Sequence, residues 1–436
     1  MVDTSLESPL PPSARRFYRP LGRAAQRTAG AVLSGVKMRA VVASALVALA
    51  LVSLVQLLVD ESVLRLGWQV WRMQDTLPEE GPMGLALFLG MLATRRFTWR
   101  GRTPSRPCPD QVQRAVALLD AQPHACAGLV RLGDKSVLFS DCGKAFIMYA
   151  RKGRSLVALF DPVGDRAAWP DLVAAFCDLA RRQGCRPVFY QVSQDFLPHA
   201  VDLGLHSLKL GEQAVVDLTT FDTRGGDWVK LRRSINRAER DGLQFAMLSP
   251  AEVLAAMDDL ENVSNAWLAQ HNAAEKGFSL GTFKRDYVAS GPVAVIRLDG
   301  RIVAFASILT ADAGGDAFID LMRHLPDTHR GMMDLLFVRT MEHLKGAGYR
   351  ALNLGMAPLA GLSSHAHAPL WNRIGRRVYR TGERYYNFQG VHSFKSKFDP
   401  QWQPRYFVVK GAALPVVALF DVTMLIGGGL RGVLRR

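Results

Sequence analysis

After the first hundred residues, the spacing of apolar positions switches repeatedly between the period of a strand and the period of a helix. Two strand-like runs, at 144–150 and 155–160, are joined by a turn that contains glycine. The pattern then predicts an amphipathic helix over 169–183, a stop at Gly184 and another strand over 187–192. This part of the chain therefore has the order hairpin, helix, strand.

The chain then repeats the same order with different residues. Its predicted elements are strands at 293–298, 302–309, 318–322 and 349–354 and a helix at 332–345. The Asp299-Gly300 turn between the first two of these strands is a strong hairpin signal. We therefore expect an α/β protein with two related domains, 105–245 and 246–410, a crevice between or beneath them, and the site carried by the second domain.

This order of elements resembles that of the N-acetyltransferase (GNAT) fold, which predicts tandem domains of that type. N-acetyltransferases hold the pyrophosphate of coenzyme A on a Gly-rich loop before the central helix, where backbone N–H groups meet phosphate. The corresponding loop here, 329–332, contains a single glycine, Gly331. The sequence therefore argues against coenzyme A as a donor, and no cofactor is predicted.

An uncharged apolar run at 40–59 can cross a bilayer, because a helix rises about 1.5 Å per residue and the hydrocarbon core is roughly 30 Å thick. Arginine and lysine residues precede it and no small-residue cleavage site follows it, which favours an anchor over a cleaved signal peptide. We therefore expect a basic cytoplasmic tail at 1–38 and a membrane anchor at 39–104. A shorter apolar run at 83–93, closed by a basic cluster, is either a second span or a helix lying on a surface.

The C-terminal segment, 411–436, is apolar and rich in glycine, with Asp421 inside it and arginines at its end. A helix lying in the membrane interface and a buried terminal helix both fit this pattern. The two alternatives remain open at this point.

Charge and cysteine usage narrow the classes of partner. The formal charge is +15, from 54 Lys and Arg against 39 Asp and Glu, which favours nucleic acid or an acidic membrane surface as a partner. The five cysteines include no pair at CxxC spacing, so neither a disulfide framework nor a zinc knuckle is predicted. His365 and His367 lie in a predicted loop without further ligand residues nearby, and we predict no metal site.

Seven motifs, taken together and in order, carry a resemblance to a known family. They are FDPVGD (160–165), GEQAVVDL (211–218), KLRRSINRAERDG (230–242), FIDLMRH (318–324), GMMDLLFV (331–338), LNLGMAPL (352–359) and YYNFQGVHSFKSKFDPQW (385–402), followed by PRYFVV. The set resembles the cytoplasmic synthase domain of the phosphatidylglycerol lysyltransferase family, which comprises the multiple peptide resistance factor proteins and their alanyl relatives. The resemblance covers roughly 105–410.

The resemblance implies an enzyme that transfers an amino acid from aminoacyl-tRNA to a glycerol hydroxyl of phosphatidylglycerol. Lysine is the expected amino acid and alanine is the alternative. The product lowers the negative charge of the membrane, which implies resistance to cationic antimicrobial peptides. The expected location is the bacterial inner membrane, with the catalytic domains facing the cytoplasm. Typical members carry a long multi-span flippase region, whereas this chain has one or two candidate spans, so lipid synthesis is implied and lipid flipping is not.

Asp320 and Arg323 are the first candidates for the site. They lie at the end of a strand that otherwise reads as buried, where charges are costly unless they are paired or used. We expect Arg323 to hold a phosphate, and Asp320 to contact the ammonium group of the amino acid or to help activate the hydroxyl. A structural Asp–Arg pair is the alternative.

Two further candidates lie on the elements that follow. Asp334 stands in the first turn of the predicted helix, where a carboxylate can serve the substrate or simply suit the helix dipole. Asn353, on the next strand, can donate to a substrate carbonyl or satisfy buried backbone groups.

Lys395 and Lys397 alternate with Phe394 and Phe398, as they would on a strand with one basic and one aromatic face. Because the family motif includes them, the resemblance assigns both lysines to the tRNA 3′ end or to the lipid phosphate. A solvated basic face is the alternative.

The predicted helix at 228–240 separates into an apolar stripe and a basic stripe. The basic stripe consists of Lys230, Arg233, Arg237 and Arg240. It can follow the phosphates of the tRNA acceptor arm, because neutralising backbone charge dominates such binding, or it can rest on anionic lipid.

Two other classes of protein compete with this interpretation. One is an N-acyltransferase that uses an acyl thioester, which the missing Gly-rich loop disfavours. The other is a non-catalytic, membrane-bound module that binds tRNA or lipid. The sequence identifies neither the general base, since a ribose hydroxyl of the tRNA can assist proton transfer itself, nor the oligomeric state.

Overall fold

The structure is a computed structural model that describes residues 109–428, apart from 123–124, 272, 311–314, 366, 382–387 and 412–415. The chain separates into two compact units, 1–100 and 101–436, and every described residue belongs to the second. The predicted basic tail and membrane anchor lie outside the described residues. Within the described ranges, no helix is both long enough and apolar enough to cross a membrane.

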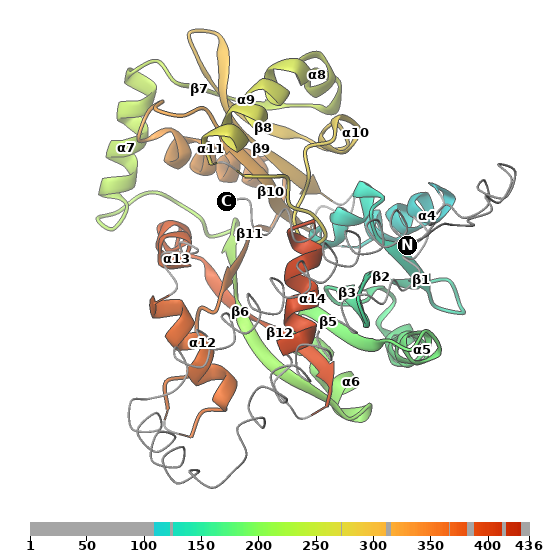
Figure 1. Cartoon of the computed structure of the whole chain (residues 1–436). Coiled ribbons are helices and arrows are strands. Elements are labelled where there is room, and N and C mark those ends of the chain that lie inside the picture. The colour runs from blue at the N-terminus through green and yellow to red at the C-terminus, as the bar shows by residue number, and fades with distance from the viewer. Residues whose placement is uncertain are drawn as a thin grey trace, which may run out of the picture. The chain divides into compact units, whose positions relative to one another are not determined.

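A single mixed sheet of twelve strands runs through the described part of the chain (Figure 1). The strands are β1 (Ser136–Phe139), β2 (Ala145–Lys152), β3 (Ser155–Leu159), β4 (Val163–Gly164), β5 (Arg186–Val192), β6 (Leu205–Asp217), β7 (Gln244–Leu248), β8 (Val293–Leu298), β9 (Arg301–Thr310), β10 (Asp316–His324), β11 (Ala351–Pro358) and β12 (Gln401–Lys410). Their order in the sheet is β1-β2-β3-β5-β12-β6-β11-β10-β9-β8-β7, with β4 paired to β2. The expected mixed α/β fold is confirmed.

Helices cover both faces of this sheet. The longer ones are α4 (Pro109–Asp120), α5 (Trp169–Arg182), α7 (Val229–Arg240), α9 (Met257–Gln270), α11 (Met332–Gly346), α12 (Leu370–Thr381), α13 (Phe388–Ser396) and α14 (Val416–Ile426). The shorter ones are α6 (Leu197–Asp202), α8 (Pro250–Ala255), α10 (Arg285–Val288) and the 3₁₀ helices η2 (Cys126–Leu132), η3 (Arg166–Ala168) and η4 (Gln194–Phe196).

The two halves of the chain exchange strands at the centre of the sheet. Strand β12, near the C-terminus, lies between β5 and β6, and β6 pairs on its other side with β11. Helix α7 also packs with the second half, against α11. Both β6 and α7 precede the domain boundary predicted at residue 245, and the sheet does not break there. The division into domains at that residue stays a prediction.

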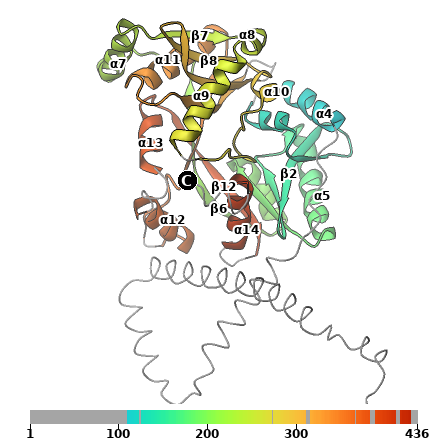
Figure 2. The same ribbon diagram turned by 45° about the horizontal axis from the view of Figure 1, so that its top comes forward.

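Alternation along the strands sorts side chains between two faces. On β8 and β9, Val293, Val295 and Phe305 face one apolar cluster, whereas Ala294 and Ile296 face another. Helix α9 lies across the first face, where it packs on β9 and β10, and α11 packs on the second (Figure 2). The periodicity that predicted these elements therefore reflects real burial on both faces.

Strands β10 and β11 separate after a short parallel pairing. Only Asp316–Phe318 pair with Ala351–Asn353. Beyond that point the register of β10 against β9 shifts between Ile319 and Met322, and β11 shifts against β6 after Asn353. Irregularities of this kind redirect side chains at the edges of sites. The candidate residues Asp320 and Arg323 on β10 and Asn353 on β11 lie in this part of the sheet.

One predicted element is wrong. Residues 394–398 form the end of helix α13 and a turn, where the sequence predicted a strand. Phe394 and Phe398 are four residues apart, which places them on the same side of a helical turn. Both rings pack on Phe337 of α11, with ring centroids 5.0 and 5.2 Å away. This aromatic packing determines the local structure, and it is compatible with the helical spacing as well as with the strand spacing.

Candidate functional site

A cavity of about 660 Å³ lies where the two halves of the sheet meet. Its wall comes from η2, from the loop after β3, from the loop after β5, and from β6, β10, β11 and β12. Segments from both halves of the chain therefore build one space, which we call the central cavity. Of the residues predicted for the site, Asn353 lines it, whereas Asp320, Arg323, Asp334, Lys395 and Lys397 do not.

In the described part of the chain, five charged side chains line this cavity: Arg166 and Asp195 pair with each other near the surface, and Asp161, Asp316 and Arg405 come from distant segments. Asp161 follows β3, Asp316 begins β10 and Arg405 lies on β12, and all three charges act on the thiol of Cys126, a partly buried residue. Burial raises the pKa of that thiol to about 11, although Arg405 opposes the change. The thiol is therefore protonated near neutral pH and is no nucleophile.

The carboxyl group of Asp161 is held in a desolvated position. Burial raises its pKa, while the backbone N–H of Ser193, which donates to its Oδ1 over 2.8 Å, and the charge of Arg405 lower it. A desolvated carboxyl group gains most from a cationic or hydrogen-bonding ligand, because such a ligand restores the stabilisation that water supplied.

The cavity wall also carries unsatisfied donors. The indole Nε1 of Trp169 and the Nε of Arg405 are buried and have no hydrogen-bond partner in the described part of the chain. The guanidinium of Arg405 donates from Nη2 to Gln213 on β6. Buried donors are normally paired. Both nitrogens are shielded from water, so a ligand in the cavity does not reach them in this conformation.

The FDPVGD motif shapes this wall. Phe160 adopts a left-handed φ of 62°, and its N–H donates to the carbonyl oxygen of Tyr190 over 2.9 Å. At Gly164 a Cβ atom would lie 2.1 Å from the carbonyl oxygen of Lys144, so only glycine fits. The side chain of Asp165 accepts from the N–H of Ala167 and begins η3. The motif therefore fixes the backbone conformation of this loop, and that conformation places Asp161 in the cavity wall.

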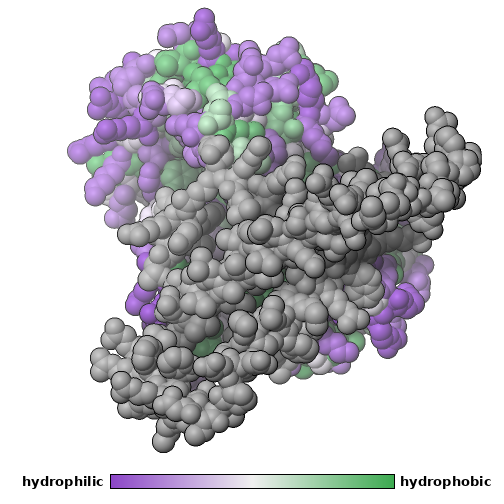
Figure 3. All heavy atoms as spheres, in the orientation of Figure 1, coloured by the Kyte–Doolittle hydropathy of each residue, from purple (hydrophilic) through white to green (hydrophobic). Residues whose placement is uncertain are grey.

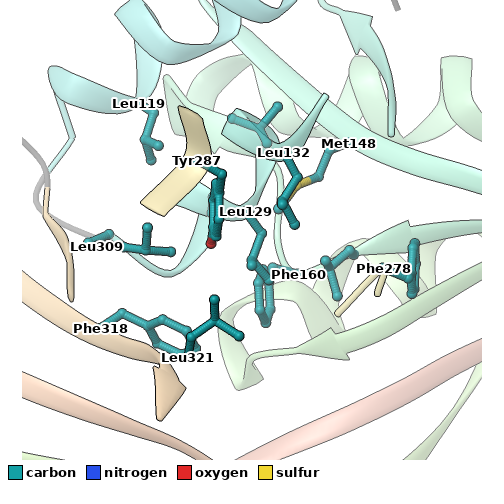
Figure 4. Packing of buried hydrophobic residues seen from close by; sticks show 14 of the residues in the cluster. Leu119, Leu129, Leu132, Met148, Phe160, Phe278, Tyr287, Leu309, Phe318 and Leu321 are labelled. Carbon is teal, nitrogen blue, oxygen red and sulfur yellow. The ribbon is translucent and has the colours of Figure 1, made fainter. Parts of the chain in front are cut away.

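The carboxyl group of Asp320 accepts two hydrogen bonds, one from Gly281 in the loop before α10 and one from Tyr287 on α10. The N–H of Gly281 donates to its Oδ1 over 2.8 Å, and the hydroxyl of Tyr287 donates to its Oδ2 over 2.7 Å. Tyr287 stands among apolar side chains with its hydroxyl pointing toward the strand that carries Phe318 and Leu321 (Figure 4). Burial raises the pKa of Asp320, and these two donors oppose the rise most strongly.

Arg323 is buried, with 4% of its surface exposed, and its guanidinium is occupied. Its Nη1 and Nη2 lie 2.8 and 2.7 Å from the two carboxylate oxygens of Glu275, and Nη1 also lies 2.6 Å from the hydroxyl of Ser264. The Cζ atom lies 5.4 Å from the ring centroid of Trp267. The carboxylate that pairs with Arg323 is thus Glu275, and Asp320 has partners of its own. The predicted roles in substrate binding stay predictions.

Asp334 joins three elements at the start of α11. Its Oδ1 lies 2.9 Å from the Nζ of Lys397, and its Oδ2 accepts from Ser234 of α7 over 2.8 Å. The side chain of Lys397 is 47% exposed, so this pair is only partly shielded from water. The structure therefore brings two predicted residues together in a contact that the sequence did not indicate.

Asn353 and Lys395 each make a hydrogen bond with the backbone of β11 just beyond the point where it leaves β10. The Oδ1 of Asn353 accepts from the N–H of Gly355 over 2.9 Å, and the Nζ of Lys395 donates to the carbonyl oxygen of Met356 over 3.0 Å. Burial lowers the pKa of Lys395 to about 7. A lysine with this pKa is partly neutral at physiological pH and can accept a proton.

The four basic residues of α7 are exposed, and the apolar residues Leu231, Ile235 and Ala238 are buried, as the sequence predicted. Hydrophilic side chains gather along the edge of the molecule where α7 lies (Figures 1 and 3). Arg237 pairs with Asp241 at 3.4 Å, and the Nε of Arg240 donates to the carbonyl oxygen of Asn236. Lys230 and Arg233 extend the basic stripe.

Sequence reasoning missed the charged residues of the central cavity. Asp161 belongs to FDPVGD and Arg405 to PRYFVV, motifs that marked the family without suggesting roles for these residues. Glu275 and Tyr287 lie in a stretch without clear periodicity, so no signal pointed to them. Within the described ranges, no group of three or more His, Cys, Asp or Glu side chains could hold a metal ion.

Comparison with known proteins gives one consistent result. A family model described as phosphatidylglycerol lysyltransferase, C-terminal, matches residues 116–409. The chain is 35% identical over 320 residues to the phosphatidylglycerol lysyltransferase of Bacillus subtilis, covering 73% of this chain and 37% of that protein. It is 34% identical over 281 residues to that of Staphylococcus epidermidis, covering 64% and 33%. The match therefore spans about a third of the length of these curated relatives.

Solved structures agree with the sequence relatives. The C-terminal domain of a protein described as a lysylphosphatidylglycerol synthetase, from Agrobacterium fabrum, is 49% identical with a TM-score of 0.68, covering 74% of this chain and 99% of that one. The structure of L-PGS from Bacillus licheniformis is 36% identical with a TM-score of 0.63, covering 74% and 98%. The chain therefore belongs to the phosphatidylglycerol lysyltransferase family, and residues 116–409 are its match to the C-terminal domain of that family.

Proposed function

We propose that this chain transfers lysine from lysyl-tRNA to a glycerol hydroxyl of phosphatidylglycerol at the bacterial inner membrane, with the described domain in the cytoplasm. The observation that carries the proposal is the central cavity, where Asp161, Asp316 and Arg405 converge inside the region matched by the family. The product carries added positive charge, so the membrane becomes less anionic and less attractive to cationic antimicrobial peptides. The two halves of the sheet correspond in this proposal to tandem acyltransferase-like units.

The chemistry of the cavity suits the aminoacyl end of lysyl-tRNA. A lysyl ester carries two ammonium groups, and the cavity presents the carboxylates of Asp161 and Asp316. The ester and the ribose also carry acceptor oxygens, and the side chains of Arg166, Gln403 and Arg405 in the cavity wall are hydrogen-bond donors. A ligand with ammonium groups and acceptor oxygens therefore matches both the carboxylates and the donors of the cavity wall.

The reaction is a transesterification. A glycerol hydroxyl of the lipid attacks the ester carbonyl, a new ester bond forms, and the bond from the carbonyl carbon to the ribose oxygen breaks. The proton of the attacking hydroxyl ends on the ribose oxygen that leaves. Donors that stabilise the negative charge developing on the carbonyl oxygen lower the barrier, and Arg166 and Arg405 are cationic side chains of the cavity wall. Asp320 and Arg323 lie outside the lining of the central cavity. Their predicted roles are a separate part of the proposal: Asp320 contacts the ammonium group of the amino acid or helps to activate the hydroxyl, and Arg323 holds a phosphate.

The basic stripe of α7 fits the acceptor arm of the tRNA. Its exposed side chains point away from the apolar stripe, as a surface for phosphates requires. Lys395 and Lys397 are assigned to the 3′ end or to the lipid phosphate, as the family resemblance implies.

The test uses the full chain in phosphatidylglycerol vesicles, with tRNA that carries radiolabelled lysine or, separately, alanine. We expect label in the lipid from lysyl-tRNA, and at least a tenfold loss of rate in Asp161→Asn and Asp320→Asn. Asp178→Asn is the matched control, because the side chain of Asp178 on α5 is 50% exposed, lies outside the cavity lining and pairs with Arg181 over 2.9 Å. Label from alanyl-tRNA alone would establish the alanyl enzyme. Binding of tRNA and lipid without transfer would establish a non-catalytic module.

A further inference from the structure

Helix α14 buries one side and exposes an apolar strip on the other. Ala418, Val422 and Met424 are buried, and the helix packs against β2 and β3. The strip consists of Val416, Val417 and Phe420, whose exposed fractions are 50%, 39% and 45%. These positions share one face, because residues three and four apart lie together on a helix. Apolar area of this kind is costly in water and marks a contact surface.

The charged residue of α14 faces inward. The Oδ2 of Asp421 accepts from the hydroxyl of Ser155 over 2.6 Å, and a Cβ atom at Gly153 would lie 2.9 Å from its Oδ1. The helix is therefore fixed to the β2–β3 turn by a buried contact. As a result, α14 presents no carboxylate beside its apolar strip.

Basic residues lie beside the β2–β3 turn on which α14 packs. Lys152 and Arg154 flank Gly153 in the turn, and Arg186 pairs beside Ser155 at the start of β5. The charges of Arg186 and Lys152 both act on Asp421, which shows that they lie close to α14. An apolar strip beside cationic side chains is the pattern of a helix that lies on an anionic bilayer. A second copy of this chain would bring like charges together, so charge favours lipid over self-association.

The inner end of α14 reaches the loop that holds Asp320 and Arg323. The carbonyl oxygen of Ile426 accepts from the N–H of Gly277 over 2.9 Å. In the same loop, Glu275 pairs with Arg323 and the N–H of Gly281 donates to Asp320. Helix α14 is therefore joined directly, by the hydrogen bond between Gly277 and Ile426, to the loop whose residues position Asp320 and Arg323.

A cleft of about 330 Å³ opens at this junction. Leu425 and Gly428 line one side of it, and Lys276, Phe278 and Thr282 line the other. Asp134 and Glu275 also line the cleft, and their carboxylates pair with Lys135 and Arg323. The hydroxyl of Thr282 donates to the carbonyl oxygen of Lys276, so the ammonium of Lys276 is the partner in this wall for a phosphate, beside apolar side chains that suit an acyl-glycerol segment.

We infer that α14 lies on an anionic bilayer, and that the head group of phosphatidylglycerol enters through the cleft between α14 and the loop 275–282. Val416, Val417 and Phe420 enter the apolar layer, Lys152, Arg154 and Arg186 meet lipid phosphates, and Lys276 receives the phosphate of the entering lipid. The second part of this inference rests on the proposed function, whereas the contact with the bilayer does not.

Photocrosslinking tests the bilayer contact without requiring activity. Phe420→p-benzoylphenylalanine is introduced into the full chain, which is placed in vesicles that contain radiolabelled phosphatidylglycerol and irradiated. The matched control is Leu254→p-benzoylphenylalanine on α8, where the native side chain is 63% exposed. We expect labelled protein from position 420 and at least tenfold less from position 254. Equal labelling at both positions, or none at 420, would overturn the contact.

Replacing Lys152 and Arg154 by glutamine in the crosslinking chain should lower the yield at position 420 about fivefold for each residue, because a basic side chain near an anionic surface is worth about that factor. An unchanged yield would overturn the assignment of these residues to lipid phosphates.

Steady-state transfer tests the cleft. For Lys276→Glu we expect the mole fraction of phosphatidylglycerol that gives half the maximal rate to rise at least fivefold, with the KM for lysyl-tRNA unchanged, and Lys276→Arg should restore the native value. Leu254→Glu is the control and should change neither constant. An unchanged lipid dependence in Lys276→Glu would overturn the cleft as the route of entry. If the native chain transfers no lysine at all, the proposed function fails while the crosslinking result still decides the bilayer contact.

Discussion

Arg323 and Glu275 form a two-pronged ion pair, with nitrogen–oxygen distances of 2.8 and 2.7 Å, between a buried strand and a loop without regular structure. The side chain of Arg323 is 5% exposed and that of Glu275 is 29% exposed. The pair therefore holds the loop that contains Glu275 against β10. It also identifies the partner of Arg323, which the sequence alone did not indicate.

Removing this carboxylate should destabilise the domain. Glu275→Gln leaves the guanidinium of Arg323 buried with a neutral partner, and we expect a loss of about 1–3 kcal/mol, below the range for fully buried pairs because Glu275 is partly exposed. The melting temperature of the detergent-solubilised chain measures the change. Glu342→Gln, at an exposed pair with Arg339, is the control. Equal melting temperatures in the two variants would contradict the role of this pair.

Position 281 is expected to tolerate only glycine, because a larger side chain would displace the carboxyl group of Asp320. A Cβ atom there would lie 1.8 Å from the Oδ2 of Asp320, so Gly281→Ala must displace a carboxyl group that is held by two hydrogen bonds. We expect a loss of at least tenfold in the transfer rate, measured with radiolabelled lysyl-tRNA. Gly346→Ala is the control, because nothing lies within 4 Å of a Cβ atom at that position. A normal rate in Gly281→Ala would show that transfer does not depend on this position of Asp320.

The lowered pKa of Lys395 predicts a specific dependence of stability on pH. Burial lowers its pKa from 10.5 to about 7, so between these values the unfolded chain binds more protons at this site than the folded chain does. The contribution of Lys395 to the free energy of unfolding therefore rises as the pH increases from about 7 toward 10.5 and is constant below that window. Melting temperatures at several pH values should show a smaller rise in Lys395→Met than in the native chain. Parallel curves would contradict the lowered pKa.

The basic stripe of α7 should determine how salt affects tRNA binding. Each phosphate contact contributes close to one unit to the slope of log K against log salt. We expect Lys230→Gln and Arg233→Gln each to reduce that slope by about 0.7–0.9, measured by filter binding of lysyl-tRNA at several KCl concentrations. Arg301→Gln, at the exposed first residue of β9, should leave the slope unchanged. An unchanged slope combined with weaker binding to anionic vesicles would assign the stripe to lipid.

The elements with strong periodicity could be predicted from the sequence, because burial on one face leaves a repeating pattern. The helices over 169–183 and 332–345 and the hairpin around Asp299 were predicted close to their observed bounds. The position of β12 between β5 and β6 could not be predicted, since local periodicity carries no information on which distant strands pair.

The site was less accessible to prediction than the fold. Asp320, Arg323 and Asp334 were found as charged groups, but their partners Gly281, Glu275 and Ser234 lie in other segments. Gly281 and Glu275 have no sequence signal of their own, and the motif that contains Ser234 does not indicate its contact with Asp334. The aromatic pair Phe394 and Phe398 misled the prediction because a spacing of four satisfies a helix and a strand equally. Asp161 and Arg405 became candidates only once the fold had brought their segments together.

The position of β12 also has a consequence for how the protein is made. A ribosome synthesises β5 and β6 long before residues 401–410, so each of these strands waits with one edge unpaired until the final part of the chain emerges. A nascent or truncated chain that ends before Gln401 lacks the strand that joins the two sets of neighbours, and it also lacks Arg405. Completion of the sheet and completion of the cavity are therefore the same late event, and an unfinished chain has open edges that chaperones and proteases can recognise.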